Sequence, residues 1–397
     1  MSAPTPRHAS SQRHRASRLA RGAGLAALSL ALFASSSFAI AYNDIQGNID
    51  RHDIDDLLGE RPTAEGEDEQ LPIDSSAGED LNLVVLGSDT RAGDINASFG
   101  STPEGGQRSD TTMIVHISAD RERVEVVSIP RDTLVTIPSC RMPDGSETAP
   151  QYDAMFNTAF STGADNGGLG AAAACTMRTI EELSGVYIDD FVIVDFAGFM
   201  NVVDALGGVP MCLEEPIRSD KAHVDLPAGP QVLDGHQALG FARARYGIED
   251  GSDISRIGRQ QQLVAAIARE AMSKNLLTDM PALYRFLDAA TSTLTTGTQL
   301  GSIPTLAGLA YSLRGINLDH IVFETMPFEY AGNRVRPTDE AEELWAALRA
   351  DEPIQGALTA SGEEPTEGTT DAPTDEPTTE EPPVTADPEP TQTSICP

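Results

Sequence analysis

The chain has 397 residues, with 61 acidic against 27 basic side chains and a formal net charge of −34. This length exceeds one average domain, so a sizeable core with appended segments is expected. The acidic balance excludes a nucleic-acid binder, because contact with phosphate backbones requires a basic face. Apolar residues make up 40% of the chain, which suffices for a globular core and excludes a wholly disordered protein.

The N-terminal residues 1–21 are basic and precede an uncharged run over residues 22–42. Arginines before an apolar run hold that end of a chain in the cytoplasm, and 21 residues match the length of a membrane-spanning helix. Ser37-Phe38-Ala39 also resembles a signal-peptidase site, so a cleaved signal peptide is the alternative to the anchor that the length favours. Both interpretations export the chain. The anchor predicts a single-pass protein of the cell membrane with its main domain on the extracellular side.

Two acidic segments flank the expected domain. Residues 43–80 are interrupted by Gly and Pro and are interpreted as a spacer. In residues 351–397, Pro, Thr, Glu and Asp dominate and aromatic residues are absent, which is typical of a disordered, solvated tail. The folded domain is therefore expected over residues 81–350.

Export of the chain affects how its four cysteines are interpreted. In an oxidising compartment an even number suggests disulfides, and four cysteines allow three pairings. None lies in a C-x-x-C motif, so the sequence gives no support to zinc or thioredoxin-like chemistry. The four residues are Cys140, Cys175, Cys212 and Cys396.

Strand-like and helix-like patterns alternate within the expected domain. The expected strands cover residues 81–86, 112–117, 124–129, 191–196 and 321–323. The expected helices cover residues 170–184, 197–206, 253–273 and 339–349. This alternation predicts an α/β domain with a central sheet covered on both sides.

Four motifs carry arginines, three of them beside a carboxylate, close to expected strand ends or at the start of the helix at residue 253. They are Arg108-Ser109-Asp110, Ser128-Ile129-Pro130-Arg131-Asp132, Arg243-Ala244-Arg245-Tyr246 and Asp253-Ile254-Ser255-Arg256-Ile257-Gly258-Arg259-Gln260-Gln261. Guanidinium forks match phosphate oxygens, and neighbouring carboxylates, with Asp89 among them, suit Mg²⁺. A single Arg–Asp pair is more often a structural ion pair. Together, the four motifs predict a phosphoryl-transfer site.

The helix over residues 253–273 carries a face that changes character along its length. Arg256, Gln260, Leu263 and Ile267 follow a spacing of four, three and four residues and therefore share one face. This face is polar in the first turns and apolar further along. The pattern predicts that Arg256 and Gln260 point into a cavity whose wall continues as Leu263 and Ile267, which would suit a lipid attached to a phosphate.

The ordered motifs resemble the LytR-CpsA-Psr family over about residues 80 to 350, and the anchor and tail are similar to those of its exported actinobacterial members. Besides the four arginine motifs, the matching segments are Leu83 to Arg91, Val194-Asp195-Phe196, Val203 to Val209, Leu226-Pro227-Ala228-Gly229 and Leu233-Asp234-Gly235. The resemblance implies a three-layer α/β/α fold with a central mixed sheet and a long apolar groove for a polyprenyl chain.

The resemblance also implies an activity. It is a Mg²⁺-dependent transfer of a glycopolymer phosphate from a polyprenyl-diphosphate carrier to a peptidoglycan hydroxyl, which forms a phosphodiester and releases polyprenyl phosphate. Two alternatives stay open. A polyprenyl-diphosphate-glycan pyrophosphatase would use water as the nucleophile, and a non-catalytic envelope regulator would bind lipid-linked precursors without turnover.

The resemblance assigns roles by motif. Asp89 and Asp110 would hold Mg²⁺, and Asp132 or Asp253 would assist the incoming hydroxyl. The residues implied to neutralise or bind the diphosphate are Arg91, Arg108, Arg131, Arg243, Arg245, Arg256, Arg259 and Gln260. For the disulfides, similar cysteines in the family imply the pairs Cys175–Cys212 and Cys140–Cys396.

Overall fold

The computed structural model describes residues 9–59, 78–88, 107–244, 253–274, 280–292 and 294–354, without the side chains of residues 9–22, 38, 253 and 280–282. The helices are α1 (Ala9–Asn48), α2 (Asp55–Leu58), α4 (Thr158–Ser184), α5 (Phe196–Ala205), α6 (Gly235–Arg243), α7 (Asp253–Ser273), α8 (Met280–Thr291), α9 (Ile303–Ser312) and α10 (Asp339–Arg349), with short 3₁₀ turns η1 (Leu313–Gly315) and η2 (Leu318–His320).

A seven-stranded mixed sheet, in the order β1-β12-β7-β2-β3-β4-β13, forms the centre of the fold. Its strands are β1 (Asp50–Arg51), β12 (Leu294–Thr296), β7 (Asp190–Val194), β2 (Leu81–Ser88), β3 (Ser109–Ile117), β4 (Val124–Ser128) and β13 (Ile321–Thr325). Strands β2 and β7 are parallel, as are β4 and β13, whereas β3 runs antiparallel to both of its neighbours. The carboxyl ends of β2, β4, β7 and β13 therefore lie at one edge, together with the start of β3.

Four two-stranded ladders complete the strands. They pair β5 (Leu134–Ile137) with β6 (Gln151–Met155), β8 (Val209–Leu213) with β11 (Gly229–Leu233), β9 (Ile217–Ser219) with β10 (Val224–Leu226), and β14 (Phe328–Ala331) with β15 (Arg334–Pro337). The expected strands and helices of the domain are all present, and the predicted α/β/α fold with its mixed sheet is confirmed.

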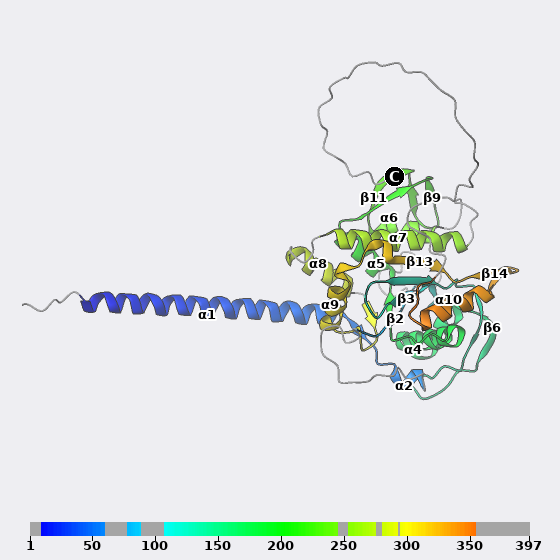
Figure 1. The fold of residues 1–397 in the computed structure, drawn as a ribbon, viewed down its shortest axis with the longest axis horizontal. Coiled ribbons are helices and arrows are strands. Elements are labelled where there is room, and N and C mark those ends of the chain that lie inside the picture. The colour runs from blue at the N-terminus through cyan, green and yellow to red at the C-terminus, as the bar shows by residue number, and fades with distance from the viewer. Residues whose placement is uncertain are drawn as a thin grey trace, which may run out of the picture.

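One face of the sheet, here called the packed face, is covered by α4 and α10 (Figure 1). Phe160 on α4 and Trp345 on α10 are at most 1% exposed and belong to one large cluster of buried apolar side chains. Gly163 allows α4 to fold back on itself at its kink, because a Cβ there would lie 2.2 Å from the carbonyl oxygen of Ala171. Close packing of this kind makes a core sensitive to the loss of single side chains.

The opposite face, here called the half-covered face, lies under α7 and α9. Its cluster has eight buried apolar residues, among them Leu83 and Phe323, and ten that are only partly buried. The partly buried group includes Val264 on α7 and Leu306 on α9. Apolar surface is therefore incompletely removed from water on this side.

A third cluster packs the other side of α7 against α6 and the β8–β11 and β9–β10 ladders. Leu263 is 1% exposed inside this cluster, and Ile267 packs against it. The expectation that these two residues wall a lipid cavity is therefore wrong, because their face of α7 looks away from the sheet. Val264 and Ala265, one position further round the helix, face the half-covered side of the sheet instead.

The structure corrects both predicted disulfides. Cys140, just beyond β5, is bonded to Cys175 on α4, and their Cα atoms are 5.3 Å apart. The predicted pairs Cys175–Cys212 and Cys140–Cys396 are therefore wrong. The reason is tertiary: β5 packs on α4, which brings Cys140 and Cys175 together, whereas Cys212 lies on β8 in a different cluster and is disulfide-bonded elsewhere.

The start of the expected spacer is part of the folded unit. Asp50 and Arg51 form the edge strand β1 beside Thr295 and Thr296 of β12. Ile54 is 5% exposed and packs in the core of the packed face. Residues 45–58 are thus domain, and residues 60–77 of the expected spacer lie outside the described part of the chain.

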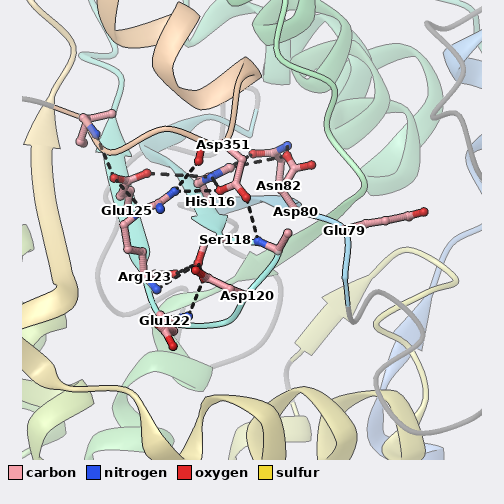
Figure 2. Close-up of polar contacts among 12 residues, drawn as sticks. Glu79, Asp80, Asn82, His116, Ser118, Asp120, Glu122, Arg123, Glu125 and Asp351 are labelled. Carbon is pink, nitrogen blue, oxygen red and sulfur yellow. Dashed lines mark hydrogen bonds and ion pairs between the residues drawn. The ribbon is translucent and has the colours of Figure 1, made fainter.

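A buried polar network closes the sheet edge opposite the carboxyl ends of β2, β4, β7 and β13 (Figure 2). Asn82, His116 and Glu125 lie side by side on β2, β3 and β4, and each is at most 5% exposed. Asp351, which follows α10, places one carboxylate oxygen 3.1 Å from His116 Nε2 and 2.8 Å from Arg123 Nη2. The end of the last helix is therefore tied to the sheet.

Candidate active site

The two central arginine motifs meet at the edge where β4 ends and β3 begins. In the antiparallel pair Met113 lies opposite Ser128, so Asp110 and Arg131, each three residues beyond that pair, lie at the same edge. Arg131 Nη1 donates to Asp110 Oδ1 at 2.8 Å. Side-chain exposures of 21% for Arg131 and 38% for Asp110 leave both groups within reach of solvent and of a ligand.

Asp132 lies between two guanidinium groups. Its Oδ1 atom is 3.7 Å from Arg131 Nε and 3.6 Å from Arg334 Nη1. Arg334 comes from β15, which is also tied to the motif through the Val335 amide and the Asp132 carbonyl oxygen. The sequence motifs did not reveal Arg334, because it is separated from Asp132 by about two hundred residues and stands in no arginine–carboxylate motif.

The first turns of α7 bring further positive charge to the same edge. Arg256 is 3% exposed, and its Nη2 donates to the carbonyl oxygen of Asp110 at 3.0 Å. Arg259 is 4% exposed and donates to the carbonyl oxygen of Ala244, just after α6, at 2.7 Å. Buried guanidinium groups keep their charge, so α7 contributes two fixed cations that link β3 to the end of α6.

The two glutamines that follow fix the position of the helix. Gln260 Nε2 donates to the carbonyl oxygen of Ala242 at 3.3 Å, on the α6 side. Gln261 Nε2 donates to Ser128 Oγ on β4 and to the carbonyl oxygen of Glu324 on β13, each at 3.0 Å. Arg256 and Gln260 are 3% and 9% exposed and therefore point inward, whereas the cavity predicted to receive them stays a prediction.

Arg243 and Arg108 stand at two further positions. Arg243 ends α6, and its guanidinium lies over the ring of Phe196 at 4.6 Å, which orients it by a cation–π contact. Arg108 is exposed directly before β3. Of the remaining predicted residues, Asp89, Arg91 and Arg245 lie outside the described residues, and so does the side chain of Asp253.

Of the two carboxylates predicted to hold Mg²⁺, the structure describes Asp110. Among them, no group of three or more His, Cys, Asp or Glu side chains is arranged to hold a metal. Mg²⁺ in phosphoryl-transfer sites is commonly bound by only one or two carboxylates together with substrate phosphates. Asp110 fits one such ligand position, because its carboxylate is exposed enough to be reached and lies among the arginines.

Comparison with known proteins identifies the family. The sequence pattern of the LytR_cpsA_psr family matches residues 48–350. The chain is 31% identical over 278 residues to the probable cell wall biosynthesis protein LcpB of Corynebacterium glutamicum, which covers 68% of this chain and 61% of LcpB. It is 29% identical over 251 residues to the polyisoprenyl-teichoic acid–peptidoglycan teichoic acid transferase TagU of Oceanobacillus iheyensis, covering 63% of this chain and 69% of TagU.

Solved structures agree on the fold. The LytR-Csp2A-Psr enzyme from Actinomyces oris has a TM-score of 0.51 at 20% identity, covering 75% of this chain and 95% of that one. TagV of B. subtilis has a TM-score of 0.51 at 23% identity, covering 70% and 99%. The aligned region spans about three fifths of the length of LcpB. With most of its length matched in order, the chain belongs to the LytR-CpsA-Psr family.

Proposed function

We propose that the protein is a membrane-anchored phosphotransferase that moves a glycopolymer phosphate from a polyprenyl-diphosphate carrier to a peptidoglycan hydroxyl. The observation that carries the proposal is the convergence of Arg131, Arg256 and Arg259 with Asp110 and Asp132 at one sheet edge. In a protein of net charge −34, a cluster of fixed cations points to an anionic ligand. Relatives named as teichoic acid transferases support the reaction class.

The half-covered face supports a lipid-linked substrate. It adjoins the arginine site through α7, whose first turn carries Arg256 and whose later residues Val264 and Ala265 face the sheet. Apolar side chains that are only partly buried gain free energy when a hydrocarbon chain covers them, about 25 cal/mol per Å² of apolar surface. We therefore place the polyprenyl chain between the sheet and α7 and α9.

The N-terminal helix supports the membrane location. Within α1, residues 23–48 are long enough to cross a membrane, and an 18-residue stretch among them has a mean hydropathy of 1.8. The basic residues before them favour an orientation with the domain outside the cytoplasm. A disulfide between Cys140 and Cys175 agrees with an oxidising compartment.

In the proposed step, the oxygen of the acceptor hydroxyl attacks the phosphorus atom that bears the glycan. A new P–O bond forms, and the bond from that phosphorus to the bridging oxygen of the diphosphate breaks. Polyprenyl phosphate leaves with the bonding electrons, and the hydroxyl proton passes to the Asp132 carboxylate. Arg131, Arg256 and Arg259 neutralise the charge on the diphosphate, and Arg334 approaches the same Asp132 oxygen as Arg131 and helps to position it.

Asp110 would hold a magnesium ion, which would supply further neutralisation of the diphosphate charge. We assign Asp89, Arg91, Arg245 and Asp253 supporting roles by motif alone. Arg108 and Arg243 stand at the rim of the site, where Arg243 is oriented by Phe196. Gln260 holds the helix against α6 rather than acting on the phosphate, because its amide donates to Ala242.

The test uses the full chain in lipid vesicles with a radiolabelled polyprenyl-diphosphate oligosaccharide and a peptidoglycan acceptor, with Mg²⁺ or EDTA. Arg131→Ala should slow transfer by roughly 10²- to 10³-fold, the usual cost of losing one electrostatic stabiliser. Arg218→Ala is the matched control, since Arg218 is an arginine paired with an aspartate on the surface, at 76% side-chain exposure.

The destination of the label distinguishes the candidate functions. Label on peptidoglycan that depends on Mg²⁺ and on Arg131 supports the transferase. Label released only as soluble phospho-glycan would show a pyrophosphatase. Lipid substrate that stays bound without turnover would show an envelope regulator, and in both of these cases the proposal would be wrong.

A further inference from the structure

The helix that carries the apolar span continues into the domain without a break. Helix α1 ends at Asn48, well beyond the uncharged run. Near its end, the Tyr284 hydroxyl of α8 donates to Asp44 Oδ2 at 2.7 Å, and Asn48 Nδ2 donates to Asp288 Oδ1 at 2.9 Å. Two hydrogen bonds between charged or polar side chains thus fasten α1 to α8.

A second set of contacts fastens α1 to the start of α9. The side chain of Gln46 donates to the carbonyl oxygen of Gly301 at 2.8 Å and accepts from the amide of Ile303 at 3.0 Å. Ile45 and Ile49 beside it are each 6% exposed. The last two turns of α1 are therefore a docked part of the domain, and a rigid helix rather than a linker joins the domain to the apolar span.

This docking fixes the orientation of the domain relative to the apolar span of α1. Figure 1 shows α1 leaving the domain on the side of α8 and α9, and the axis of α7 nearly parallel to that of α1 in this view, with the two helices running in opposite chain directions. The first turn of α7, with Arg256, lies at the end away from α1. Twenty-one helical residues at 1.5 Å each separate the two ends of α7 by about 30 Å.

Large apolar side chains are exposed at the end of α7, at the end of α9 and in the turn η2 that follows α9. Met272 near the end of α7 is 42% exposed, Tyr311 at the end of α9 is 57% exposed, and Leu318 in η2 is 37% exposed. The Arg314 guanidinium lies 3.6 Å from the centroid of the Tyr311 ring. Aromatic rings with a neighbouring cation are favoured at the boundary between lipid headgroups and hydrocarbon.

We propose that this end of the domain, marked by Met272, Tyr311 and Leu318, rests in the headgroup layer of the outer leaflet. Helix α1 holds the domain upright on that surface, so that the arginine site stands about 30 Å above the bilayer. The inference rests on the membrane anchor of the proposed function and adds an orientation to it. In this orientation the half-covered face leads the lipid chain from the bilayer along α7 to the site.

The test places a tryptophan reporter at each end of the domain in the full-length protein. Trp345, the single native tryptophan, is 1% exposed and gives a constant buried background. The reporter variant is Tyr311→Trp, and the matched control is Tyr330→Trp, because Tyr330 on β14 is also an exposed tyrosine, at 67%. Both proteins are reconstituted in phosphatidylcholine–phosphatidylglycerol vesicles with and without brominated acyl chains.

Brominated lipid should quench the added emission of the 311 reporter by about half and leave the 330 reporter unchanged, since bromine quenches only on close approach. Absence of quenching at 311, or equal quenching at both positions, would overturn the orientation. Gln46→Ala together with Asn48→Ala, which undocks α1, should reduce the quenching at 311.

The readout does not require turnover, so the two proposals fail separately. Transfer of glycan without quenching at position 311 would support the transferase and contradict the upright orientation. The expected quenching pattern without any transfer of label would support the orientation and contradict the transferase.

Discussion

The two faces of the central sheet differ in how completely their apolar side chains are buried. On the packed face, thirty-one buried apolar residues form one cluster with only eight partly buried neighbours. On the half-covered face, partly buried apolar residues outnumber buried ones, ten against eight. Burial of apolar surface is the main favourable term in folding, so the packed face supplies most of the stability. The half-covered face retains apolar surface that a ligand can bury.

The largest effect is expected from a truncation on the packed face. Leu348 on α10 is fully buried in the cluster that also contains Trp345. Leu348→Ala should lower the free energy of unfolding by about 3 kcal/mol, because it removes buried methyl groups and leaves a cavity. Urea denaturation followed by circular dichroism measures the loss. A loss of less than about 1 kcal/mol in the free energy of unfolding would show that the packed face repacks easily. The proposed difference in packing between the two faces would then be wrong.

The second largest loss of stability is expected in the buried polar network around His116, at the sheet edge opposite the arginine site. Asp351→Ala removes the partner of Arg123 and of buried His116, and should cost about 2 kcal/mol. Asp319→Ala, at an exposed aspartate in η2, is the control and should cost less than about 0.5 kcal/mol. Equal costs for the two variants in urea denaturation would contradict the network's contribution.

The matched truncation on the half-covered face should lower the free energy of unfolding less and weaken the binding of polyprenyl phosphate more. Leu306 on α9 is only partly buried, so Leu306→Ala should cost about 1 kcal/mol. Polyprenyl phosphate should raise the melting temperature of the wild type and of Leu348→Ala, because a ligand bound only by the native state stabilises it. In Leu306→Ala this rise should shrink, and a rise of undiminished size would place the lipid elsewhere.

The smallest effect is a pH dependence at the edge strand β13. Burial raises the pKa of Glu324 above its ordinary value. The folded protein then holds the Glu324 proton to higher pH than the unfolded chain does, so stability falls as pH rises above the ordinary glutamate range. Glu324→Gln removes this loss. The variant should gain less than about 0.5 kcal/mol at neutral pH, because the partly exposed carboxylate is screened, and nothing at about pH 3, below the ordinary glutamate pKa. Melting curves at the two pH values test the sign.

The sequence allowed the sheet and much of the site to be predicted, because both depend on local pattern. Apolar runs marked β2, β3 and β4, and the antiparallel pairing of β3 with β4 then brought Asp110 beside Arg131. Strand β1 was missed because it consists of Asp50 and Arg51, two exposed charged residues with no strand signal. Its place in the sheet comes from pairing with β12, far away in the sequence.

Other errors arose where tertiary packing decides between equivalent local patterns. Four cysteines carry no information on which two will be adjacent, and the packing of β5 on α4 selected Cys140 and Cys175. Helix α7 is buried on more than one side, so its periodicity identified Leu263 as inward-facing without saying which neighbour it meets. Arg334 reaches the site only because β15 joins the segment after Asp132.

The network around His116 fixes the orientation of its ring. Nδ1 lies 2.7 Å from Asn82 Oδ1, and Asn82 is oriented by donating its side-chain N–H to Asp80. Nε2 lies 3.1 Å from an oxygen of Asp351. Both ring nitrogens therefore face oxygen atoms, one on β2 and one just beyond α10.

The carboxylates of Asp80, Glu125 and Asp351 also face the ring, and Arg123 lies beside Glu125 and Asp351. A single buried side chain thus joins the start of β2 to a residue just beyond the last helix.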